Sequence, residues 1–105
     1  MARDKFSVLT EQMFYILLCL KQERCGSEIT QQCMQLTHGR IKIGPGTLYN
    51  LLDQFLKADI IKEIPSQSKK RNYILTDKGF ELLASEYERI RIQTADYEKL
   101  ILGKE

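Results

Sequence analysis

The segment that decides the fold spans residues 44–79 and reads GPGTLYNLLDQFLKADIIKEIPSQSKKRNYILTDKG. It opens on a Gly-Pro-Gly turn, after which a helix is expected from Thr47. Apolar residues then recur at the i, i+3, i+4 and i+7 spacing of an amphipathic helix, namely Leu48, Leu51, Leu52 and Phe55. Two short strands are predicted at residues 60–64 and 72–75. They are joined by a polar hairpin tip that carries Lys69, Lys70 and Arg71.

Two further helices are predicted upstream of this segment. Thr10 has the side chain of an N-cap, and the apolar run behind it indicates a buried first helix that ends near Arg24. Ser27 is the expected N-cap of the second helix, which ends at His38 and the glycine after it. The alternation of polar and apolar residues at 40–43 predicts a very short strand.

The last helix is predicted to begin at Thr76 and to run to about Leu102. Apolar or hydroxyl-bearing side chains follow each other along it in steps of three and four, at Phe80, Leu83, Tyr87, Ile90, Thr94, Tyr97 and Ile101. Such a stripe would be left in water on a lone helix, so we expect it to pack on a second helix. The predicted dimer contacts are Leu83, Tyr87, Ile90, Tyr97 and Ile101.

The order of these elements predicts a mainly α (α+β) fold. A winged helix-turn-helix DNA-binding domain is expected at residues 1–76 and a long C-terminal dimerisation helix at residues 77–105, as one compact domain overall. In this architecture the third helix enters the major groove, where amides bond base edges, while hydroxyls and cations suit phosphates. The predicted DNA contacts are Thr47, Tyr49, Asn50, Gln54, Lys69, Lys70 and Arg71.

Composition excludes several other classes of protein. The chain has 105 residues and a net charge of +2, with the excess of basic side chains in residues 1–78. Its longest apolar run has eight residues, so we expect no membrane span and a cytoplasmic location. Three cysteines without a CxxC pair, and His38 as the only histidine, predict neither a metal site nor a cofactor. The sequence shows neither a glycine-rich phosphate loop nor a nucleophile with a matched base, so we do not expect an enzyme.

Two motifs resemble the PadR-type transcriptional regulators. The first is Gly46-Thr47-Leu48-Tyr49, followed by Leu52, Leu56 and the turn Asp59-Ile60-Ile61. The second is Tyr73 with Leu75-Thr76-Asp77-Lys78-Gly79, which is similar to the family's second wing strand and the start of its final helix. The resemblance covers about residues 8–102, and the single last helix resembles that of the shorter PadR subgroup. Asn50 stands where the family often has Pro, and Ala58-Asp59 replaces an acidic residue and Gly.

The resemblance implies a dimeric repressor that binds a double-stranded DNA operator as a homodimer. It further implies that the last helix packs on the partner's first and last helices, and that a small aromatic or cationic effector binds near the dimer interface. Phe14, Tyr15, Tyr87 and Tyr97 are the candidates for stacking on such an effector, because the chain has no Trp.

Simpler interpretations stand beside each of these predictions. The four aromatic residues also suit an ordinary core or dimer seam, Tyr49 suits the edge of the core, and residues 69–71 suit a solvated loop tip. The second functional hypothesis is a winged-helix protein–protein interaction module that does not bind DNA. Charge reversal at Lys69, Lys70 and Arg71 separates the two hypotheses, because only the DNA-binding protein depends on those charges.

Overall fold

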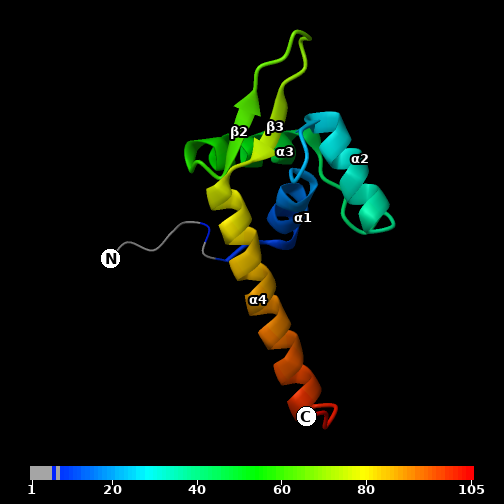
Figure 1. Ribbon diagram of the computed structural model, residues 1–105. Helices are drawn as coiled ribbons and strands as arrows, with labels where there is room; N and C mark the ends of the chain where they lie inside the picture. Colours follow the sequence, from blue (N-terminus) through cyan, green and yellow to red (C-terminus); the bar gives the residue numbers. More distant parts are fainter. Residues whose placement is uncertain (1–5, 7) are drawn as a thin grey trace.

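Four helices and three short strands follow one another in the part of the chain that the computed structural model describes, residue 6 and residues 8–105 (Figure 1). In order, they are α1 (Glu11–Cys19), β1 (Arg24–Cys25), α2 (Gly26–Leu36), α3 (Pro45–Lys57), β2 (Ile61–Ile64), β3 (Asn72–Leu75) and α4 (Asp77–Leu100). This order confirms the mainly α fold with a wing that the sequence predicts. The predicted first domain begins at residue 1, so its first residues lie outside the described part.

The starts and ends of the first two helices differ in part from the prediction. Thr10 does cap α1, because its Oγ1 accepts a hydrogen bond from the backbone N–H of Met13 at 3.2 Å. However, α1 ends at Cys19 rather than near Arg24. The N-cap of α2 is Cys25 rather than Ser27, and the backbone N–H of Cys25 donates to Glu28 Oε1 at 2.9 Å.

The first helix ends early because the chain turns to add a strand to the wing. β3 lies at the centre of an antiparallel sheet, with β1 on one side and β2 on the other. A two-residue strand shows no periodicity, so the sequence did not predict β1. The prediction of a strand at residues 40–43 is wrong. Ile41 and Ile43 are both buried in the core, so the alternation reflects burial of an unpaired segment.

The core lies between the helices and the sheet: α1 packs against α2 and the first turns of α4, and α3 packs against α2 and β2 (Figure 1). Its largest fully buried side chains come from all three wing-domain helices and from the sheet: Ile16, Leu17, Leu20, Ile29, Leu48, Leu52, Phe55, Ile60, Ile61 and Tyr73. The apolar positions that predicted the third helix, Leu48, Leu51, Leu52 and Phe55, are therefore all core residues. This packing fixes the rotation of α3 and the direction of its polar face.

Two residues set the path of the chain from α3 into the wing and α4. Asp59 has a φ of +61°, in the left-handed region, which Asp tolerates better than most residues. Gly79 is buried in the first turn of α4, where an added Cβ would lie 2.3 Å from the carbonyl oxygen of Ile60. A side chain at Gly79 would therefore collide with the backbone at the start of the wing.

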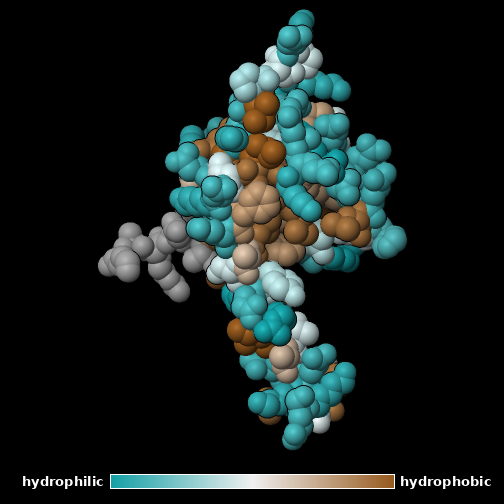
Figure 2. All heavy atoms as spheres, viewed as in Figure 1, coloured by the Kyte–Doolittle hydropathy of each residue, from teal (hydrophilic) through white to brown (hydrophobic). Residues whose placement is uncertain are grey.

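The C-terminal half of α4 extends away from the rest of the molecule (Figure 1). Every residue from Tyr87 to Leu102 is exposed except Glu98, which is half-buried. Figure 2 shows hydrophobic patches on this projecting segment as well as on the body of the molecule. Among the described residues, no helix has the length and apolar character that crossing a membrane requires.

Candidate nucleic-acid interface

The polar face of α3 is presented to solvent opposite its core-facing residues. Thr47, Asn50 and Asp53 are exposed on this face, and Asn50 points about 160° away from the buried Leu48 at 100° per residue. The Asp53 carboxylate lies 3.1 Å from the Nζ of Lys57, one helical turn further on. Lys57 thus offsets a negative charge that would otherwise repel a phosphate.

A cleft joins α3 to the wing. It has a volume of about 340 Å³ and brings together residues from three separate segments: Cys25, Gly26 and Ser27 at the start of α2, Tyr49 on α3, and Lys69, Lys70 and Arg71 on the wing. Four of the seven predicted DNA contacts therefore line one concave surface. Its cations and the Tyr49 hydroxyl are groups that bind phosphate oxygens.

Tyr49 reaches this cleft because Gly26 leaves room for it. A Cβ on Gly26 would lie 2.4 Å from the Tyr49 hydroxyl oxygen and 2.9 Å from the adjacent ring carbon. The Tyr49 side chain is nevertheless about half exposed, so its ring lies over α2 without being part of the core. Gly26 is a position of the candidate site that sequence reasoning missed, since only the tertiary structure brings it under Tyr49.

The three basic residues at the wing are not equivalent. Arg71 donates two hydrogen bonds to the carboxylate of Glu63, at 3.1 and 2.8 Å, and its guanidinium lies 5.5 Å from the centre of the Tyr73 ring. The hydrogen bonds from Arg71 hold the pKa of Glu63 below its usual value. Within the described part of the chain, Lys69 and Lys70 form no ion pair, so their charges are the ones available to an anion.

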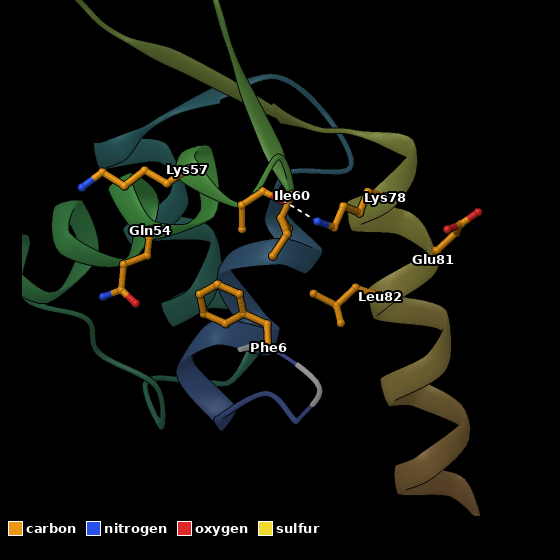
Figure 3. A pocket seen from close by; sticks show the side chains of 8 residues that line it. Phe6, Gln54, Lys57, Ile60, Lys78, Glu81 and Leu82 are labelled. Carbon is orange, nitrogen blue, oxygen red and sulfur yellow. Dashed lines mark hydrogen bonds between the residues drawn. The ribbon is translucent and has the colours of Figure 1, made fainter. Parts of the chain in front are cut away.

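Gln54 does not line the cleft that Tyr49 shares with the wing. It is half-buried and lines a cavity of about 580 Å³ between α3, the N-terminal segment and the start of α4 (Figure 3). Phe6, Ile60 and Leu82 supply apolar walls of this cavity, and the Lys78 Nζ donates to the carbonyl of Ala58 at 2.8 Å. The structure thus places Gln54 on the side of α3 away from the cleft that Tyr49 lines.

Three of the four aromatic residues expected to contact an effector do come together. Phe14, Tyr15 and Tyr87 line a cavity of about 380 Å³ between α1 and α4. The Phe14 and Tyr15 rings meet edge to face, with centroids 5.7 Å apart. Tyr97 is not part of this cavity, because it lies nearly three turns further along the projecting helix.

Arg40 connects this cavity to the loop that precedes α3. Its guanidinium forms an ion pair with Glu11, donates to the Tyr15 hydroxyl at 3.1 Å and lies 5.6 Å from the centre of the Tyr15 ring. Glu11 and Tyr15 both line the cavity between α1 and α4. From the sequence alone Arg40 was indistinguishable from a general surface charge, since its partners lie more than twenty residues away.

The residues predicted for a dimer seam divide into two groups. Leu83 is half-buried and packs against the core of its own chain. Tyr87, Ile90, Tyr97 and Ile101 are exposed, and all four side chains lie within about 40° of the Leu83 direction on the helix. One face of α4 thus carries large apolar side chains that the chain itself leaves uncovered.

The fold is similar to that of solved bacterial regulators. A PadR family transcription regulator from hypervirulent Clostridium difficile R20291 aligns with a TM-score of 0.73 at 21% identity, over 88% of this chain and 99% of that one. A transcriptional regulator from Clostridium thermocellum aligns with a TM-score of 0.71 at 20% identity, over 87% of this chain and 92% of that one. A PadR-like transcription factor from Bacteroides fragilis aligns with a TM-score of 0.69 at 24% identity, over 85% of this chain and 87% of that one. No curated protein matches the chain.

At the level of sequence, residues 16–85 match the transcriptional regulator PadR-like family. This stretch is two thirds of the chain and holds α2, α3, all three strands and the start of α4. It includes both motifs on which the resemblance rests. The family consists of transcription regulators and not of enzymes. The chain therefore belongs to the PadR-like family of transcriptional regulators.

Proposed function

We propose that this protein is a dimeric, sequence-specific DNA-binding repressor that acts in the cytoplasm. The observation that carries the proposal is the cleft in which Tyr49 of α3 meets Lys69, Lys70 and Arg71 of the wing. In this proposal α3 enters the major groove, with Thr47 and Asn50 toward the DNA, while Lys69 and Lys70 bind phosphates of the neighbouring backbone. Gln54 contributes less than the sequence suggests, because it faces another cavity.

The proposed dimer forms through α4. The exposed apolar side chains of its projecting half, Tyr87, Ile90, Tyr97 and Ile101, support this arrangement, because a second copy of the helix would remove them from water. In this proposal, residues 1–76 form the DNA-binding domain and residues 77–105 form the dimerisation helix that joins the two copies. A dimer presents two α3 helices to major grooves about 34 Å apart on B-DNA.

The proposed effector is a small aromatic or cationic molecule in the cavity between α1 and α4. Phe14, Tyr15 and Tyr87 would stack on it there, and Tyr97 does not line this cavity in one chain. Arg40 supplies the physical link to DNA binding, because it contacts Glu11 and Tyr15 and lies in the loop that leads to α3. An effector that displaces Tyr15 would release Arg40 and change the position of α3.

The test of DNA binding is a salt titration with DNA from upstream of the protein's own gene and random DNA of equal length. Replacing Lys69 and Lys70 together by Ala should weaken binding to both DNAs. It should also make the slope of log affinity against log salt shallower by about 1.8. The matched control is Lys99→Ala, which removes a charge from the last turn of α4, on the side opposite Tyr97. An unchanged slope in the double variant would contradict the proposed wing contacts.

The dimer is tested by light scattering on two variants of the same chemistry. Ile90→Glu puts a charge into the exposed stripe of α4 and should yield monomers. Ile92→Glu puts the same charge about 180° from Leu83 on the same helix, where the side chain is also exposed, and should leave a dimer. Dimers from both variants would mean that α4 is not the interface. A well-folded wild-type dimer that binds no DNA at low salt would instead favour the protein–protein interaction module.

A further inference from the structure

Two cysteine thiols meet in the interior between α1 and α2. The Sγ atoms of Cys19, the last residue of α1, and of Cys33, on the third turn of α2, are 3.6 Å apart. Both residues are buried, and the Cys19 thiol also lies 3.9 Å from the carbonyl oxygen of Ile29. The third cysteine, Cys25, is engaged elsewhere, with its Sγ 3.3 Å from the hydroxyl of Ser27.

The Cys19 side of this pair faces a small cavity. The cavity has a volume of about 220 Å³ and is lined by Cys19 together with Leu18, Lys21, Gln22, Arg24, Gln32 and Leu36. A molecule the size of water or hydrogen peroxide fits such a space. Cys33 does not line this cavity, so an oxidant would meet Cys19 first and Cys33 would lie behind it.

We propose that Cys19 and Cys33 form an oxidation site that peroxide converts into an intramolecular disulfide. The Cys19 thiolate attacks one oxygen of the peroxide, the O–O bond breaks, and Cys19 becomes a sulfenic acid while the departing hydroxide takes a proton to give water. The Cys33 thiol then attacks the Cys19 sulfur, forms the S–S bond and expels a second water. Two thiols and one hydrogen peroxide thus give one disulfide and two waters.

The two sulfur atoms lie close enough to form a disulfide, and the surroundings of Cys19 set the rate of its oxidation. A disulfide has an S–S distance of about 2.05 Å, so the two sulfurs must approach by about 1.5 Å. The end of α1 can supply this movement because Cys19 is followed by a turn and not by further helix. The hydrogen bond with Cys33 and burial raise the pKa of the Cys19 thiol, whereas the same hydrogen bond lowers the pKa of Cys33, so the Cys19 thiolate that must attack the peroxide is scarce at neutral pH. The oxidation should therefore be slow at neutral pH and become faster as the pH rises.

The consequence of oxidation is a covalent link between two core helices. The bond would close a ring that spans residues 19–33, about 15 residues of chain, and would restrict the unfolded state. It would join α1 to α2, and α2 in turn packs against α3. A rise in melting temperature on the order of 10–15 °C is expected for a ring of this size in a domain of this length.

The experiment treats the full-length protein with hydrogen peroxide, removes the excess and blocks the remaining thiols in denaturant. We expect the treated chain to lose two hydrogen atoms in its mass, to carry one blocked thiol, and to yield a peptide that links Cys19 to Cys33. Its melting temperature should rise and then return to the starting value after reduction. A Cys25→Ser variant should behave in the same way, whereas Cys33→Ala should form no intramolecular link.

Three results would overturn the proposal: three thiols that stay reduced, oxygen added to Cys19 without a link, or a link that uses Cys25. Because the wild-type chain itself gives the answer, the test stands even where a cysteine variant folds poorly. Its readouts are mass and thermal stability, so the result does not depend on whether the protein binds DNA.

Discussion

Replacing Glu86 by Ala should remove the main polar tie between α4 and the N-terminal segment. Glu86 is 2% exposed, accepts the backbone N–H of Leu9 at 2.7 Å, and accepts two hydrogen bonds from Arg89 at 2.6 and 3.0 Å. The variant leaves the buried Leu9 N–H without its acceptor and Arg89 without its partner. Loss of a hydrogen bond to a buried charged group costs about 1.5–3 kcal/mol, so we expect about 2–3 kcal/mol of lost stability.

The matched control lies two residues further along the same helix. Glu88 pairs with Arg91 at 2.8 Å with the same i, i+3 spacing, but both side chains are more than half exposed. An ion pair in water contributes little, so Glu88→Ala should leave the melting temperature nearly unchanged. Glu86→Ala should lower it by about 10–15 °C. Both are measured by calorimetry at one protein concentration, since association also shifts the melting temperature.

The same site predicts a pH dependence. The hydrogen bonds from Arg89, and then that from Leu9, lower the pKa of Glu86 below its ordinary value of 4.5. A lowered pKa in the folded state gives stability that is present above pH 4.5 and is lost as the pH falls through the folded-state value. The stability difference between wild type and Glu86→Gln should therefore shrink between about pH 5 and pH 3. Two results would refute the conclusion that Glu86 is a buried, charged hydrogen-bond acceptor. One is a stability difference between wild type and Glu86→Gln that does not change with pH; the other is an equal loss of stability in Glu86→Ala and Glu88→Ala.

Two glycines give the remaining predictions. Gly79→Ala should destabilise the fold by about 2–4 kcal/mol, because its Cβ would collide with the Ile60 carbonyl. Denaturant unfolding measures this loss, and an unfolding midpoint equal to that of the wild type would contradict the close approach. Gly26→Ala should displace the Tyr49 ring and weaken binding to upstream DNA about as much as Tyr49→Ala does, with little loss of stability. Anisotropy titrations of both variants check this, and unchanged DNA affinity in Gly26→Ala would remove Tyr49 from the interface.

Much of the fold could be predicted because its signals are local. The i, i+3, i+4 spacing at Leu48–Phe55 identified α3 and its buried face, and the Thr10 and Thr76 caps located the starts of α1 and α4. Each of these signals comes from residues within two turns of one another. The predictions that failed concerned pairing between distant segments. The alternation at residues 40–43 matched a strand, but no strand among the described residues pairs with it, while the two residues of β1 pair with residues 47 and 49 positions away.

The candidate site shows the same division. The sequence identified Tyr49 and the basic wing, since both belong to recognisable motifs in the right order. It could not separate Lys69 and Lys70 from Arg71, because the Glu63 that pairs with Arg71 lies across the hairpin. Nor could it separate Gln54 from its neighbours, because only the packing of Phe6 and Leu82 shows which cavity Gln54 faces.

The sequence by itself therefore determined the order of the four helices and the hairpin of β2 and β3, the family and the polar face of α3, because short-range periodicity and local motifs carry that information. The tertiary structure alone decided which side chains meet across long chain separations. It placed Gly26 beneath Tyr49, the Glu86 carboxylate on the backbone of Leu9, the Arg40 guanidinium on the Tyr15 hydroxyl, and the thiols of Cys19 and Cys33 in contact. Such contacts depend on how whole elements pack, and no local pattern in the chain records that packing.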